Sequence, residues 1–156
     1  MVYSIVPFRQ YNAYAAMGES GNIMDIAELF RIATEAAGRS YSPYSKFRVG
    51  AALLCEDGSV VIGTNIENRS YGLTICAERS AIVSALAQGK KSFSALAISC
   101  PDASYPVSPC GACRQVISEF VGPDFPIRFG GSDGRVVDTT MGELMPHDAL
   151  HELSTR

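Results

Sequence analysis

Three cysteines and one glutamate fall in two short stretches of the sequence. The first stretch holds Cys76 and Glu78, and the second holds Cys110 and Cys113. Three thiolates can occupy three corners of a tetrahedral Zn²⁺ site and leave the fourth corner open to water. Such water ionises near neutral pH, and a neighbouring carboxylate can take its proton. The four residues therefore predict one Zn²⁺ per subunit and metal-assisted attack by hydroxide on an electrophilic carbon.

Both stretches are expected where a loop ends and a helix begins. Helices are predicted from Cys76 to Gly89 and from Cys110 to Gly122. Two helix N-termini would then meet at one metal, and their positive ends favour deprotonated thiols. Cys110 and Cys113 are three residues apart, so a helix would place them on one face. This arrangement predicts that the metal lies between two helix ends.

Two other interpretations of these cysteines remain open on sequence grounds. Cys110 and Cys113 alone could form a thioredoxin-like redox pair, or simply two buried thiols. A closed structural zinc site would need Cys55 or Cys100 as its fourth ligand. Cys55 lies within a predicted strand and Cys100 precedes a proline. Both positions are more typical of small core residues than of ligands.

The remaining pattern predicts an α/β fold with a mixed five-stranded sheet. Apolar periodicity and turn residues divide the chain into alternating helices and strands. Helices are expected over 22–38, 76–89, 110–122 and 140–146, and strands over 47–55, 60–64, 93–100, 126–129 and 136–137. Helices that alternate with strands must cover the faces of the sheet. Residues 1–22 are interpreted as an N-terminal extension of unknown role, and 23–156 as a single domain.

Composition narrows the class of partner. The 156 residues are 47% hydrophobic, which suits a globular core, and the net charge is −3. The absence of a cluster of Lys and Arg argues against nucleic acid and favours a small neutral ligand. The sequence shows neither a membrane span nor a signal peptide. Five cysteines, an odd number, indicate reduced thiols and a cytoplasmic location.

Four blocks of the sequence resemble the cytidine deaminase family. They occur in the order that the family shows, over residues 44–54, 65–68, 76–79 and 109–115. The resemblance implies a three-layer α/β/α sandwich. A cysteine at position 76, where longer relatives have histidine, resembles the short homotetrameric branch. The implied activity is hydrolytic deamination of cytidine and 2′-deoxycytidine to uridine and 2′-deoxyuridine in pyrimidine salvage.

The resemblance also implies roles for individual side chains. Cys76, Cys110 and Cys113 would bind zinc, and Glu78 would transfer the protons. Arg79 resembles an arginine that hydrogen-bonds the zinc thiolates; the less favoured alternative is a surface arginine. The residues that would contact the substrate are spread over several stretches: Phe47, which would stack on the base, Asn65 and Glu67, which would hold the ribose, Tyr71 at the ribose end, and the backbone around Ala77 and Pro109.

Two positions depart from the family pattern. Arg69 stands where relatives often have a small residue, and a guanidinium there could attract a 5′-phosphate. The C-terminal segment lacks the aromatic residue that covers a neighbouring site in the family, so His147 or Leu150 would have to replace it. Rival functions are an aminohydrolase of blasticidin S or cytidine 5′-monophosphate, a polynucleotide-editing deaminase, and the thiol oxidoreductase considered above.

Overall fold

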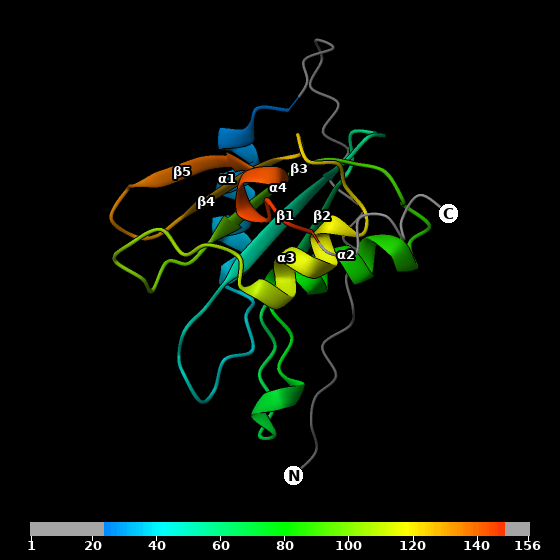
Figure 1. Cartoon of the computed structure of the whole chain (residues 1–156). Coiled ribbons are helices and arrows are strands. Elements are labelled where there is room, and N and C mark those ends of the chain that lie inside the picture. Colours follow the sequence, from blue (N-terminus) through cyan, green and yellow to red (C-terminus); the bar gives the residue numbers. More distant parts are fainter. Residues whose placement is uncertain (1–23, 149–156) are drawn as a thin grey trace.

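The computed structural model describes residues 24–148, which form a five-stranded sheet with helices on both faces (Figure 1). The predicted extension over 1–22 and Leu150 lie outside the described residues. The strands are β1 (Gly50–Cys55), β2 (Val60–Thr64), β3 (Phe93–Ser99), β4 (Pro126–Gly130) and β5 (Val136–Thr140). Their order across the sheet is β2-β1-β3-β4-β5. Only the β3–β4 pair of neighbours is parallel, so the predicted mixed sheet is confirmed.

The helices form a layer on each side of the sheet. The structure contains α1 (Ile26–Ala37), the 3₁₀ helix η1 (Tyr71–Leu73), α2 (Ala77–Ala87), α3 (Gly111–Ser118) and α4 (Met141–Leu144). Helix α1 covers one face, and α2 and α3 cover the other (Figure 1). A hydrophobic core lies on each face of the sheet, and alternate residues of β1 pack into one or the other. Ala52 and Leu54 pack on the α1 side, and Ala51 and Leu53 on the side of α2 and α3. The three-layer α/β/α sandwich is confirmed.

Two glycines let the helices lie very close to the sheet. A Cβ atom at Gly63 in β2 would be 2.3 Å from the carbonyl oxygen of Ala77 and 2.3 Å from the backbone nitrogen of Ala81. A Cβ at Gly50 in β1 would be 2.0 Å from the carbonyl oxygen of Ala33 in α1. Any side chain at these two positions would push the facing helix away from the sheet.

Several predicted boundaries differ from the structure. The first strand begins at Gly50 rather than Phe47, because the Phe47 carbonyl and the Val49 N–H form hydrogen bonds with the side chain of Asn65 instead of with a neighbouring strand. Helix α1 begins at Ile26, with Asp25 as its N-cap. The final strand extends to Thr140, where a capping box begins α4. The loop after β2 contains the short helix η1, which the polar sequence did not predict.

Strand directions explain why distant residues meet at one end of the sheet. Strands β2 and β3 both run antiparallel to β1, so they run parallel to each other. Their carboxyl ends, Thr64 and Ser99, both pair with Gly50 at the start of β1. The segment before β1 and the segments after β2 and β3 therefore leave the sheet at the same edge. Within residues 24–148, no helix is both long and apolar enough to cross a membrane.

Candidate metal centre

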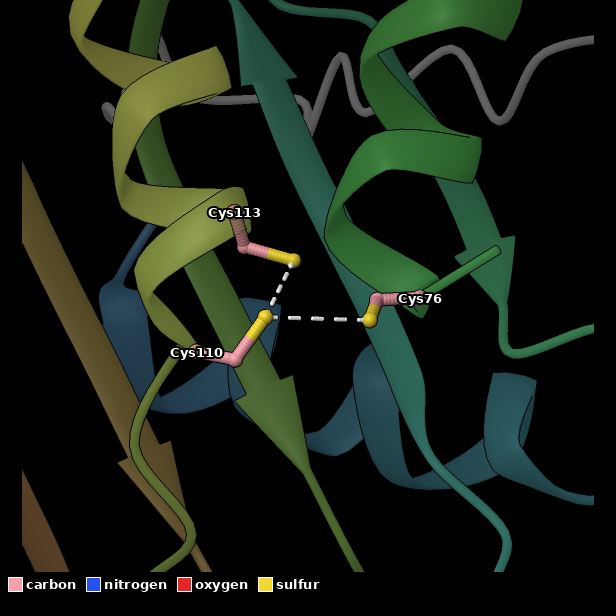
Figure 2. Close-up of side chains that lie close together, drawn as sticks. All are labelled: Cys76, Cys110 and Cys113. Atoms are coloured by element: carbon pink, nitrogen blue, oxygen red, sulfur yellow. Dashed lines mark hydrogen bonds between the residues drawn. The ribbon is translucent and has the colours of Figure 1, made fainter. Parts of the chain in front are cut away.

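The three predicted thiols meet between the N-termini of α2 and α3 (Figure 2). The Sγ atoms of Cys76 and Cys110 are 3.9 Å apart, and those of Cys110 and Cys113 are 3.5 Å apart. All three sulfur atoms lie within 4.8 Å of one another. A tetrahedral zinc ion with Zn–S bonds of about 2.3 Å requires sulfur atoms about 3.8 Å apart. The donor set and its spacing therefore fit Zn²⁺.

Local helix geometry directs these thiols toward each other. Cys76 and Cys110 are the N-cap residues of α2 and α3, with extended backbone (ψ of 157° and 164°). Neither thiol caps its own helix, although N-cap side chains commonly do so. Cys113 lies in the first turn of α3 and is fully buried. Because both N-cap thiols are spared from capping, they are available as ligands.

Cys55 and Cys100 do not belong to this cluster of the described residues. Both are buried, at 2% and 0% exposure, and burial raises the pKa of each thiol. Buried, protonated thiols of this kind behave as small core residues. Among residues 24–148 the cluster thus offers three candidate ligands rather than four, which disfavours a closed structural zinc site.

The Glu78 carboxylate is buried beside the cluster. It is 4% exposed and belongs to the first turn of α2, two residues after Cys76. Burial raises the pKa of Glu78 to about 7, and repulsion from Cys76 adds to this effect. A carboxyl group whose pKa is close to neutral pH can both accept and release a proton.

Arg79 provides positive charge next to the sulfur atoms. Its Nη2 donates to the Thr74 carbonyl at 3.1 Å and to Cys76 Sγ at 3.7 Å. Interaction with the Cys113 thiol lowers the pKa of Cys76 to about 5, and the Arg79 and Cys110 side chains also favour its thiolate. The same interaction and burial raise the pKa of Cys113, so Cys76 ionises before Cys113. The Arg79 guanidinium compensates part of the charge of this thiolate.

Asn65 and Glu67 hold the loop that precedes β1. The Asn65 side-chain amide donates to the Phe47 carbonyl at 2.8 Å, and its oxygen accepts from the Val49 N–H at 2.8 Å and from the Ser40 hydroxyl at 2.5 Å. Because two donors already occupy this oxygen, only the remaining amide hydrogen is available to a ligand. The carboxylate of Glu67 accepts from the Tyr44 N–H at 2.8 Å and from the Ser45 hydroxyl and N–H.

The other predicted substrate contacts lie at the same edge. The Phe47 N–H donates to the Ser45 hydroxyl at 3.0 Å, which connects Phe47 to Glu67 through one side chain. Ala77 is buried as the first residue of α2, directly after Cys76. Tyr71 is 74% exposed and lies edge-on to Tyr44, with ring centroids 5.9 Å apart. The exposed Arg69 lies in the same loop as Tyr71.

Sequence reasoning missed the residues that connect the loops at this edge. Arg48 donates to Asp102 from its backbone N–H at 2.8 Å, from Nε at 2.9 Å and from Nη2 at 2.6 Å. This pair ties the segment before β1 to the segment after β3, and it lowers the pKa of Asp102 to about 2. Ser40 and Ser45 were missed as well. No local pattern reveals such pairs, because their partners are far away in the sequence.

A three-layer sandwich that holds three thiols and a buried carboxylate at two helix N-termini defines a zinc hydrolase. The family described as "Cytidine and deoxycytidylate deaminase zinc-binding region" matches residues 24–127. Cytidine deaminase from Sporosarcina psychrophila is 48% identical over 123 residues, which cover 79% of this chain and 90% of the relative. The protein belongs to the cytidine and deoxycytidylate deaminase family.

A solved structure and a more distant relative agree with this assignment. The crystal structure of cytidine deaminase from Burkholderia pseudomallei superposes with a TM-score of 0.75 at 44% identity, covering 79% of this chain and 98% of the other. Blasticidin-S deaminase from Bacillus cereus is 37% identical over 126 residues, which cover 76% of this chain and 88% of that protein. The fold and the family predicted from sequence are both confirmed.

Proposed function

We propose that the protein hydrolytically deaminates cytidine and 2′-deoxycytidine. The observation that carries the proposal is the buried Glu78 carboxylate beside three thiols that fit Zn²⁺. A zinc site with three protein ligands leaves one position for a reactant, whereas a purely structural site does not. The higher identity to a cytidine deaminase than to a blasticidin-S deaminase supports the nucleoside as substrate.

Each residue of the site has a chemical task in this reaction. When bound, Zn²⁺ supplies the Lewis acidity that makes water a nucleophile near neutral pH. Glu78 accepts the proton of that water, passes it to N3 of the pyrimidine and then helps to protonate the leaving amine. Arg79, which donates to Cys76 Sγ, offsets the net negative charge that three thiolates give the site. The backbone around Ala77 and Pro109 faces the edge of the base.

The substrate is held by the loops that meet at the edge of the sheet. Phe47 stacks on the pyrimidine, and Asn65 and Glu67 contact the ribose hydroxyls. The Glu67 carboxylate accepts from the Tyr44 N–H, and the Asn65 side chain bonds the backbone of Phe47 and Val49; these hydrogen bonds fix the segment that carries Phe47. One group of side chains therefore orients the base and the sugar together, which favours a ribosyl substrate over a free base. Tyr71 lies at the ribose end.

A panel of cytosine compounds tests this proposal directly. Loss of the ultraviolet absorption band of the aminopyrimidine is followed for cytidine, 2′-deoxycytidine, cytidine 5′-monophosphate, blasticidin S and free cytosine. Cytidine and 2′-deoxycytidine are expected to react fastest. Turnover of blasticidin S alone would identify the rival aminohydrolase, and a preference for the 5′-monophosphate would assign Arg69 to phosphate binding. No turnover of any compound would refute the proposed function.

Zinc content provides an independent test of the ligand assignment. The Cys110→Ala variant loses one of three ligands and is expected to retain less than about one-tenth of the zinc of the wild type. The Cys100→Ala variant removes a buried thiol outside the cluster and serves as the matched control, with full zinc content. Equal zinc in the two variants would contradict the assignment of Cys110.

We also propose that the protein assembles as a homotetramer. The two loops beside the site expose a group of large apolar side chains: Tyr41, Tyr44, Ile66, Tyr71, Leu73 and Ile75, each at least 40% exposed. Exposed apolar groups of this size are typical of interfaces. Multi-angle light scattering is expected to give four times the mass of one chain, and a fully active monomer would exclude this assembly.

A zinc site made of thiolates also supports the proposal of a reducing, cytoplasmic location.

A further inference from the structure

The side chain of Arg114 joins two parts of the chain that meet at the zinc site. Arg114 follows Cys113 in α3 and is partly buried. Its Nε donates to the Pro109 carbonyl at 2.9 Å, and its Nη2 to the Ser108 hydroxyl at 3.3 Å. Its Nη1 donates to the Leu144 carbonyl at 2.9 Å. Three nitrogen atoms of one guanidinium thus reach three acceptors on two segments.

The first segment, residues 108–109, leads directly into Cys110. Pro109 is buried and immediately precedes Cys110, the N-cap of α3. Proline fixes one backbone angle of this segment, and the hydrogen bond from Arg114 Nε fixes the Pro109 carbonyl. The Arg114 backbone N–H also donates to the Cys110 carbonyl at 2.9 Å. Both the backbone and the side chain of Arg114 therefore restrain the position from which the Cys110 thiol projects.

The second segment is the carboxyl end of α4. Leu144 is the last residue of this four-residue helix, so no later turn of the helix satisfies its carbonyl. The other end of α4 is held by the capping box of Thr140 and Glu143. So short a helix is not stable by itself and depends on such contacts. The positive guanidinium supplies both a donor and a favourable charge at its carboxyl end.

We infer that Arg114 is a positioning residue of the zinc site, which fixes the Ser108–Pro109 segment and couples it to the end of α4. The inference rests on the proposed zinc chemistry but not on the identity of the substrate. A planar fork of donors is required, because a lysine ammonium places its three donors on one atom and does not span the same acceptors. Loss of the guanidinium fork loosens the segment before Cys110 and the carboxyl end of α4 at the same time.

Zinc release tests this inference without any measurement of activity. The zinc-loaded wild type and the Arg114→Ala and Arg114→Lys variants are mixed with excess of a chromogenic chelator, and the rate of zinc transfer is recorded. We expect Arg114→Ala to release zinc about 10- to 100-fold faster, as for other residues that orient metal ligands, and Arg114→Lys to fall between it and the wild type. A rate for Arg114→Ala within twofold of the wild type would overturn the inference.

A matched control separates positioning from general destabilisation. Arg128 is also partly buried and also holds two acceptors, the Asp138 carboxylate oxygens at 2.6 and 2.7 Å, but it joins β4 to β5. The Arg128→Ala variant should release zinc at the wild-type rate. Adding millimolar guanidinium, at matched ionic strength, should slow zinc release from Arg114→Ala but not from the wild type or Arg128→Ala. Equal acceleration in both variants, or no rescue by guanidinium, would show that Arg114 acts only through fold stability.

Hydrogen exchange tests the coupling between the two segments. In Arg114→Ala, amide exchange should accelerate both in residues 108–110 and in residues 141–145, with little change in β1. The Thr140→Val variant, which breaks the capping box at the other end of α4, should accelerate exchange in 141–145 only. Faster exchange in only one of the two segments of Arg114→Ala would refute the coupling.

Discussion

Replacing Gly63 with alanine should displace the N-terminal end of α2, which carries Cys76 and Glu78. The new Cβ would lie 2.3 Å from both the Ala77 carbonyl oxygen and the Ala81 nitrogen, and 2.9 Å from the Ala81 Cα. Ordinary contacts begin near 3.4 Å, so the first two turns of α2 must retreat from β2 by about 1 Å. All three neighbouring atoms belong to the backbone, so no side-chain rotation relieves the clash.

The retreat moves the residues that perform the chemistry. Ala77 lies between Cys76 and Glu78, whereas Cys110 and Cys113 belong to α3 and stay in place. A misplacement of about 1 Å in an active site costs on the order of 100-fold in rate. Overpacking of this kind also lowers the free energy of unfolding by about 1–3 kcal/mol. We therefore expect a loss in kcat/KM on the order of 100-fold and a reduced zinc affinity in a protein that still folds.

Two other glycines provide controls for this experiment. Gly50→Ala clashes with the backbone of α1, on the opposite face of the sheet, so it should lower stability while the folded protein stays within about tenfold of wild-type activity. In Gly122→Ala the new Cβ has no neighbouring atom within 4 Å, so neither stability nor activity should change. Activity, zinc content and thermal unfolding are measured for all three variants. Wild-type activity in Gly63→Ala, or an equal loss in Gly50→Ala at equal folded fraction, would refute the argument.

Three further predictions concern the site and its loops. Glu78→Gln should retain zinc but lose about 10²- to 10⁴-fold in kcat, since both proton transfers need the carboxylate; turnover within tenfold of the wild type would assign them to another group. Ser45→Ala, which cuts the link between Glu67 and Phe47, should raise KM for cytidine much more than for 2′,3′-dideoxycytidine, and equal increases would contradict this role. The ion pair of Arg48 with Asp102 stabilises the fold fully above about pH 4, the pKa of an aspartate in the unfolded chain. This stabilisation is lost as the pH falls toward about 2, the pKa of Asp102 in the folded protein. The difference in thermal stability between wild type and Asp102→Asn should therefore shrink between pH 4 and pH 2, and a difference that is constant with pH would contradict the pairing.

The sequence alone predicted the cysteine cluster, the family and the alternation of helices and strands. Cysteine spacing and helix-start signals are local properties, so they are sufficient to propose Cys76, Cys110 and Cys113 as ligands. Apolar periodicity likewise located all five strands and the main helices. Element ends were less well predicted, because the Asn65 side chain competes with strand pairing for the backbone of Phe47 and Val49.

Tertiary structure decided which residues share the site and what holds them there. The thiols converge because β2 and β3 run in the same direction on either side of β1, so the helices that follow them begin at one edge. The pair formed by Arg48 and Asp102 and the three contacts of Arg114 depend on the same topology. The contacts from Arg48 to Asp102 and from Arg114 to Leu144 join residues 54 and 30 positions apart, and sequence periodicity extends over only a few turns of one element. Such long-range pairs become visible only when the chain directions are known.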